Sequence, residues 1–119
     1  MGAASEAVLK QPNDKKQVTM FKHIVMWRFI DGANGKSKLQ HAQWVKEHLE
    51  ALVGVIPEIK SLEVGINVCV AGTAYDAVLV SAFDDADAME RYKVHPAHVE
   101  VAAYFKGITE GRAEADYTV

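Results

Sequence analysis

The densest chemistry in this sequence lies in one short segment, Tyr92 to Glu100, which holds a tyrosine and two histidines. His98 shares an apolar helical face with Val101 and Phe105, because residues three, four and seven positions apart lie on one side of a helix. Burial and the positive end of the helix dipole both favour a neutral imidazole near pH 7. A neutral imidazole suits proton abstraction, and a tyrosine hydroxyl beside it can hold a carbonyl or a developing enolate.

Two further rings point toward the same apolar interior. Tyr92 shares the inward side of the preceding helix with Met89, and His23 begins a strand on the parity of Val25 and Trp27. We therefore expect a cavity with His98 and Tyr92 as candidate catalytic residues and with His23, Val25, Trp27, Met89, His95, Val101 and Phe105 as ligand-binding residues. The structural alternatives remain open, because His98 also fits a hydrogen-bonded core histidine and His95 also fits a cap or turn residue.

The other titratable groups fit structural roles better than chemical ones. His41 and His48 are seven residues apart on one helix, and we expect them at the surface, solvated or partly packed. Cys69 stands among valines near a strand end and is expected to act as a small apolar residue rather than a nucleophile. Helix capping explains the carboxylates of the next helix start better than metal binding does: Asp84, Asp85 and Asp87.

Strands and helices that position these side chains can be read from apolar periodicity. Strands are expected at residues 21–30, 59–68, 77–83 and 112–118. One helix is expected from a Ser37–Gln40 capping box to about Val53. A second helix is expected from a cap at Asp84 through Val94, and a third from Pro96 to about Lys106. The order strand, helix, strand, strand, helix, strand predicts an α+β fold of the ferredoxin-like, split βαβ type.

The predicted sheet has a helix-free face that one chain cannot cover. Strands 21–30 and 77–83 are apolar on both parities and are therefore expected to be central, whereas 59–68 alternates as an edge strand does. Helices cover only one face of such a four-stranded antiparallel sheet, so apolar residues such as Ile24 and Met26 need another cover. A second copy of the chain is the expected partner.

Composition limits the classes of protein that remain. The 119 residues fit one domain at 20–119, preceded by a polar, flexible N-terminal extension at 1–19. A net charge of −3 argues against nucleic acid and anionic membrane surfaces as partners. The sequence has one cysteine, no apolar run long enough to span a membrane and no signal-peptide core in the first twenty residues. These features together predict a cytoplasmic protein.

Four motifs together resemble the stress-responsive A/B barrel domain family over residues 21–119: Lys22-His23-Ile24-Val25, Leu52-Val53 with Ile56-Pro57, Tyr92 followed by His95-Pro96-Ala97-His98-Val99, and Asp116-Tyr117. The resemblance implies a dimeric α+β barrel made of two ferredoxin-like sheets. It also implies a homodimer that binds a small apolar molecule between sheet and helices. The family includes plant stress proteins and many members of unknown role.

The same family includes a polyketide cyclase of the olivetolic acid type, which gives the alternative function. In that cyclase the position matching His98 serves as the base and the position matching Tyr92 binds or polarises the substrate, and its strand-start histidine is matched by His23. Another pocket histidine of the cyclase falls at Ala77 here. The alternative is therefore a small cyclase or lyase acting on a carbonyl, polyketide-like substrate.

Some plant members of the family carry a magnesium ion on main-chain carbonyls after the first helix. The matching positions in this sequence are Val53, Ile56 and Ile59. Carbonyl ligation leaves no side-chain signature, so the resemblance alone implies this site. No other cofactor is expected.

Overall fold

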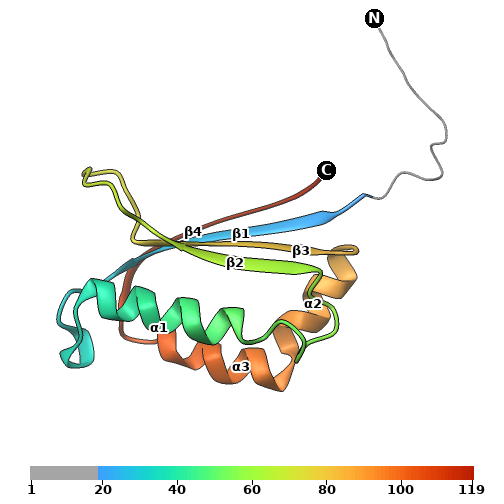
Figure 1. Ribbon diagram of the computed structural model, residues 1–119, viewed down its shortest axis with the longest axis horizontal. Coiled ribbons are helices and arrows are strands. Elements are labelled where there is room, and N and C mark those ends of the chain that lie inside the picture. Colours follow the sequence, from blue (N-terminus) through green and yellow to red (C-terminus); the bar gives the residue numbers. More distant parts are fainter. Residues whose placement is uncertain (1–18) are drawn as a thin grey trace, which may run out of the picture.

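Four antiparallel strands form one sheet, and the helices lie together on one of its faces (Figure 1). The computed structural model describes residues 19–119. The strand order is β2-β3-β1-β4, with bounds β1 (Phe21–Phe29), β2 (Ser61–Ile66), β3 (Ala77–Phe83) and β4 (Thr109–Thr118). The predicted ferredoxin-like α+β fold is confirmed, and so are the central positions of β1 and β3.

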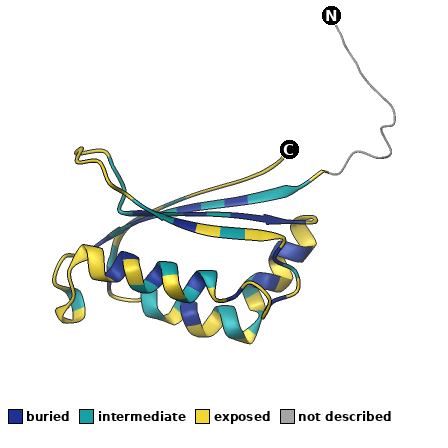
Figure 2. Ribbon diagram, in the orientation of Figure 1, coloured by how far each residue is buried: buried dark blue, intermediate teal, exposed yellow. Residues whose placement is uncertain are grey.

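Burial explains why β1 is apolar on both parities. Its alternate residues from His23 to Phe29 face the helices and are buried. Ile24 and Met26 face the other side and are half-buried by neighbouring strands alone. Figure 2 shows buried segments on both the strands and the helices, and their side chains form the core of the chain.

The helices begin at polar caps that the sequence carries. The helix α1 (Lys38–Glu50) starts at the predicted capping box, in which the Ser37 hydroxyl accepts from the Gln40 amide at 3.1 Å and the Gln40 side chain accepts from the Ser37 amide at 2.8 Å. The helix ends earlier than the predicted Val53. The turn that follows contains Gly54 in the left-handed region, with φ of 88°, where glycine carries no steric cost.

The second and third helices meet at a break before proline, as predicted. The helix α2 (Ala86–Val94) is capped by Asp85, whose carboxylate accepts from the Ala88 amide at 2.8 Å, so the prediction of Asp84 as the cap was wrong by one residue. The helix α3 (Pro96–Ala102) has Pro96 in its first turn. It continues as one 3₁₀ turn, η4 (Ala103–Phe105), and another such turn, η3 (Ala33–Gly35), precedes α1.

Element ends differ from the predicted ranges at three strands: β1 ends one residue before the predicted residue 30, and β2 and β4 differ more. The structure gives β2 as Ser61–Ile66, shorter than residues 59–68, and β4 as Thr109–Thr118, longer than residues 112–118. The longer β4 follows its pairing with β1, which continues past a register shift to Phe29↔Thr109. Sheet pairing thus extends a glycine-containing segment that local propensity left as a loop.

His41 is fully buried, which contradicts its predicted surface position. Its Nε2 lies 3.0 Å from the carbonyl of Ala33, which can only accept, so Nε2 donates and Nδ1 accepts from the Tyr104 hydroxyl at 2.7 Å. The turns η3 and η4 cover the imidazole from two sides. His48 is half-buried, as expected, and stacks on Trp44 with ring centroids 3.7 Å apart.

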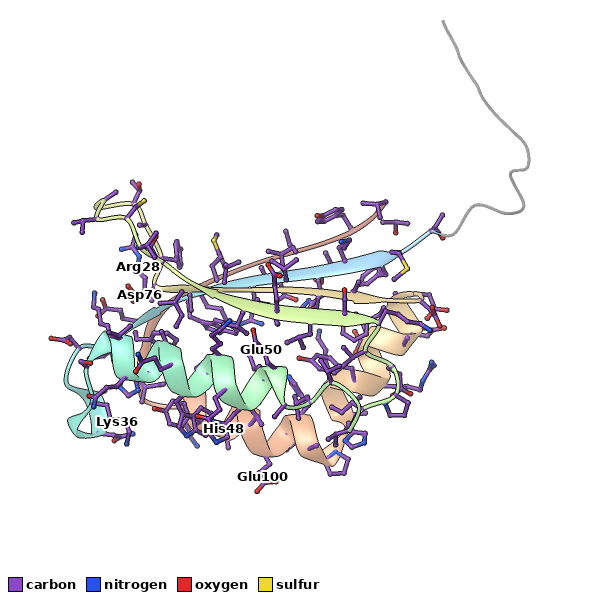
Figure 3. All side chains as sticks on the ribbon, viewed as in Figure 1. Arg28, Lys36, His48, Glu50, Asp76 and Glu100 are labelled. Atoms are coloured by element: carbon purple, nitrogen blue, oxygen red, sulfur yellow. The ribbon has the colours of Figure 1, made fainter. Side chains whose placement is uncertain are left out.

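Two charged residues of α1 hold the edge of the sheet. Lys46 Nζ donates to the Val64 carbonyl at 2.7 Å, and Glu50 accepts from the Val64 amide at 3.0 Å. Figure 3 shows Glu50 between α1 and β2. The Lys46 ammonium and the Val64 amide lower the pKa of Glu50, and the pair satisfies backbone groups that an edge strand leaves open.

The predicted N-terminal extension at 1–19 lies outside the described residues except for Thr19, so it stays a prediction. Within residues 19–119, no helix is long and apolar enough to cross a membrane.

Candidate functional site

A cavity of about 190 Å³ opens between the helical layer and the sheet, where α3 and η4 approach β1 and β4. Its lining residues are Trp27, His98, Ala102, Phe105, Thr109 and Arg112. The rings of Trp27 and Phe105 stack with centroids 4.8 Å apart and form an aromatic wall. Three of the residues predicted from the sequence, Trp27, His98 and Phe105, therefore meet at one cavity.

His98 is half-buried and has a defined tautomer when neutral. Its Nδ1 lies 2.9 Å from the Lys93 carbonyl, which can only accept, so Nδ1 carries the proton and Nε2 keeps a free lone pair. Burial is the main reason that the pKa of His98 lies below its usual value, and the charges of His23 and Lys93 act in the same direction. The arrangement favours a neutral imidazole with Nε2 as its basic atom.

Tyr92 packs against His98 with ring centroids 4.5 Å apart and is fully buried. Its hydroxyl has no hydrogen-bond partner among the described residues, although buried polar groups normally have one. Burial raises the pKa of Tyr92, so the hydroxyl stays protonated and can only act as a neutral donor or acceptor. Tyr92 lies behind His98 and is not part of the cavity lining.

His23 completes a row of three rings, 6.5 Å from Tyr92 in an edge-to-face arrangement. Its Nδ1 lies 2.6 Å from Asp116 and 3.7 Å from Glu114, both on the neighbouring strand β4. The Ser81 hydroxyl donates to the His23 main-chain carbonyl at 2.8 Å. The predicted convergence of His23, Tyr92 and His98 is thus present as a packed row, of which His98 reaches the cavity.

The other residues predicted to bind a ligand have structural roles: three lie in the core and one caps a helix. Val25, Met89 and Val101 lie in the hydrophobic core. His95 caps α3, because its Nδ1 accepts from the Ala97 amide at 3.0 Å. His95 therefore acts as a helix cap, which was its structural alternative. Val25, Met89, Val101 and His95 all lie outside the lining of the cavity at His98.

Arg112 and Thr109 line the cavity but were not predicted from the sequence. Arg112 is the sheet partner of Trp27, so its side chain lies on the helix-facing side of β4. One guanidinium nitrogen of Arg112 donates to Glu114 at 2.8 Å. The signal was the alternation in β4, where Arg112, Glu114 and Asp116 have the parity opposite to Ala113, Ala115 and Tyr117.

The residues predicted to hold magnesium lie together in the turn between α1 and β2. The side chain of Val53 is exposed, while those of Ile56 and Ile59 are buried. The Ile56 carbonyl accepts from the Ile59 amide at 3.2 Å, which leaves that oxygen one lone pair for a cation. Carbonyl oxygens are ligands that magnesium accepts, and the site stays a prediction.

A second hollow, of about 380 Å³, lies on the helix-free face below the loop between β2 and β3. Its lining includes Met26, Tyr75 and Val78. The loop above it rises away from the helices in Figure 1 and carries Val68 and Val70 almost fully exposed. Cys69, expected as a small apolar residue, is exposed in this loop.

Comparison with known proteins decides the family. The family model for the stress responsive A/B barrel domain matches residues 21–119, which span all four strands. The chain belongs to this family. A relative, the Arabidopsis thaliana stress-response A/B barrel domain-containing protein HS1, is 30% identical over 98 residues, covering 81% of this chain and 86% of that protein.

Solved structures share the ferredoxin-like fold of this chain. A dimeric protein of unknown function with a ferredoxin-like fold from Bacteroides fragilis is 35% identical, with a TM-score of 0.75 and coverage of 84% of this chain and 96% of its own. A hydroxynitrile lyase from Passiflora edulis is 19% identical, with a TM-score of 0.70 over 87% of this chain and 95% of its own, and this likeness concerns the fold alone.

Proposed function

We propose that this A/B barrel domain protein is a homodimer that binds a small, mostly apolar molecule in the cavity at His98. The observation that carries the proposal is the lining itself: a stacked aromatic pair, Trp27 and Phe105, stands beside one imidazole with a free lone pair. Such a combination of apolar walls and few polar groups is typical of ligand sites.

The volume of the cavity limits the ligand to about one ring. A water molecule occupies about 30 Å³ of liquid, so a cavity of about 190 Å³ has the space of roughly six waters. Sites for drug-sized ligands begin at about 300 Å³. A flat ring can pack against the wall formed by Trp27 and Phe105, while a carbonyl oxygen or hydroxyl group approaches the His98 and Arg112 side of the cavity.

The helix-free face supports the homodimer. Ile24, Met26, Val78 and Val80 lie side by side across the central strands of that face and remain half-exposed in a single chain. A contiguous apolar surface of this kind marks an interface in soluble proteins. The hollow at Met26 and Val78 lies on the same surface, and we assign it to the partner chain, whereas the His98 cavity lies on the opposite, helical side.

Acetophenone is a suitable probe, because it combines one aromatic ring with a carbonyl. We expect saturable binding, followed by NMR through the indole N–H signal of Trp27. Replacing His98 by Ala should weaken binding with little loss of stability, since the imidazole is only half-buried and makes one main-chain hydrogen bond, to Lys93. If acetophenone causes no saturable shift at Trp27, or if H98A loses stability and leaves binding intact, His98 is a structural residue and the proposal is wrong.

A second candidate function is proton transfer next to a carbonyl, with His98 as base. The tautomer of His98 favours it, because Nδ1 donates to the Lys93 carbonyl and burial favours the neutral imidazole, which leaves Nε2 unprotonated at neutral pH. In the step, Nε2 takes a proton from the carbon next to the carbonyl, the C–H electron pair forms the enolate, and the proton returns on reversal. Arg112 and Thr109 line the same cavity and can donate to the enolate oxygen, whereas the Tyr92 hydroxyl is fully buried outside the lining.

Deuterium exchange at the methyl group of acetophenone in D₂O tests this second function. We expect the protein to accelerate exchange and His98→Gln to remove the acceleration. His48→Gln serves as the matched control, since His48 is a half-buried histidine of α1 outside the cavity. Binding without any accelerated exchange leaves ligand binding as the function and excludes acetophenone-type enolisation by His98.

A further inference from the structure

A buried histidine and two carboxylates meet where β1 pairs with β4, away from the cavity lining. His23 and Asp116 are direct sheet partners, and Glu114 lies two residues before Asp116, so all three side chains leave the helix-facing side of the sheet. One donor atom from each lies within 4.8 Å of the others. His23 is only 4% exposed, whereas the carboxylate side chains are 28% exposed.

We propose that His23, Glu114 and Asp116 form a binding site for a divalent first-row metal ion of the Zn²⁺ type. The Nδ1 atom of His23 lies 2.6 Å from one carboxylate and 3.7 Å from the other. Ligands bound at about 2.1 Å to one ion stand roughly 3 Å apart, so small side-chain rotations bring all three atoms onto a common centre. The ion takes the place of the proton on Nδ1 between His23 and Asp116.

Neighbouring groups hold the three ligands in place. Arg112 donates to Oε1 of Glu114 at 2.8 Å, so that Oε2 is the oxygen turned toward His23. The Ser81 hydroxyl fixes the main chain of His23 at 2.8 Å. Hydrogen-bond partners of this kind orient metal ligands in proteins, and losing one typically weakens metal binding by about tenfold or more.

Charge and accessibility both favour a cation here. Glu114 and Asp116 are like charges on one face of one strand, and Arg112 offsets one of them. The exposed sides of the carboxylates leave room for water as a further ligand, as in open metal sites with three protein ligands. The helix-facing side of β4 is opposite to the face that the proposed dimer covers, so dimerisation leaves the site open.

The ligand chemistry selects the ion. An imidazole with two carboxylates suits Zn²⁺ and other late first-row ions, whereas Mg²⁺ prefers oxygen ligands alone. This distinguishes the site from the carbonyl turn at Val53, Ile56 and Ile59. It also makes the proposal independent of any ligand bound at His98.

Calorimetric titration of the metal-stripped full chain with Zn²⁺ tests the site. We expect one Zn²⁺ per chain, unaffected by excess Mg²⁺, and a weakening of about tenfold or more in Asp116→Asn and in Glu114→Gln. Both residues are partly exposed, so these variants should fold even if His23→Ala does not. A nitrogen-ligated Co²⁺ absorption spectrum, lost in Asp116→Asn, identifies the ligand set.

Glu110→Gln on the same strand and His48→Gln on α1 are the matched controls and should bind Zn²⁺ as the parent chain does. Absence of saturable Zn²⁺ binding overturns the proposal. So does Zn²⁺ binding that Asp116→Asn and Glu114→Gln leave unchanged, because the ion then occupies another site. Neither result bears on binding of acetophenone at His98, so failure here leaves the proposed function standing.

Discussion

The Tyr92 hydroxyl is a buried polar atom without a partner, and its removal gives the first prediction. Tyr92→Phe removes an unsatisfied group while keeping the ring that packs on His98 and Phe83, so we expect stability equal to or slightly above that of the parent. Tyr104→Phe is the control, because it leaves the buried Nδ1 of His41 without its donor and should cost roughly 1–3 kcal/mol.

Thermal or urea unfolding of both variants measures these differences. A loss of stability in Tyr92→Phe comparable to that in Tyr104→Phe would show that the Tyr92 hydroxyl has a structural partner. A structural role would then explain the Tyr92 hydroxyl, and no functional role would be needed.

The titration of His98 is the second prediction at this scale. Burial lowers its folded pKa below the ordinary value of about 6.5, so NMR titration of the imidazole should give a midpoint under that value. The unfolded chain then binds the proton more readily than the folded one. The contribution of His98 to stability is therefore complete above pH 6.5 and is lost as the pH falls through the folded pKa. A midpoint at or above 6.5 contradicts the assignment of His98 as a neutral base.

Some site residues could be predicted from the sequence and others could not. The helical periodicity of residues 98–105 was enough to predict His98 and Phe105 together, although Phe105 lies in the 3₁₀ turn η4 that continues α3. His41 could not be predicted as buried, since its cover comes from Ala33 and Tyr104 in two distant turns. Alternation places Arg112 on the same face of the strand as Glu114 and Asp116, but the register of β4 against β1 was needed to show that this face meets the helices.

At the scale of elements, the cap of α2 gives a prediction with a matched control. Asp85→Ala removes the carboxylate that accepts from the Ala88 amide and should cost about 1 kcal/mol of stability. Asp84→Ala removes an exposed carboxylate 3.5 Å from Lys60 and should change stability by no more than about 0.5 kcal/mol. Chemical unfolding measures the free energy of unfolding of both variants. Equal losses of stability would contradict Asp85 as the cap that distinguishes the two residues.

Element order, strand centrality and the break before Pro96 could all be predicted from apolar parity and turn residues. Element ends could not, because they depend on contacts between elements. The strand β4 extends to Thr109 because β1 is there to pair with it. Lys46 and Glu50 fit an ordinary solvated helix face by sequence, and only the nearness of Val64 gives them their second role.

At the scale of the whole molecule, the helix-free face predicts how the chain assembles. Met26 lies in the centre of that face, so Met26→Glu should convert a homodimer into a chain of 13.1 kDa, because an unpaired buried charge is costly. Gln43→Glu adds the same charge at an exposed position of α1 and should leave the dimer intact. Light scattering at micromolar concentration measures both masses. A monomeric parent, or a dimeric Met26→Glu, contradicts the arrangement.

The uncovered apolar face could be predicted from the sequence, since two central strands with two apolar faces meet only one layer of helices. The cavity could not, because its walls come from β1, β4 and the α3–η4 segment, and its volume depends on how closely these pack.

The most direct measurement of ligand binding at His98 compares two neighbouring alanines. Ala102 lines the cavity and Ala103 is exposed, so Ala102→Phe should fill the cavity and Ala103→Phe should leave it open. Each variant is titrated with acetophenone while the Trp27 indole signal is followed by NMR. We predict loss of saturable binding in Ala102→Phe and parent-like binding in Ala103→Phe. Parent-like binding in a folded Ala102→Phe would contradict the cavity as the ligand site.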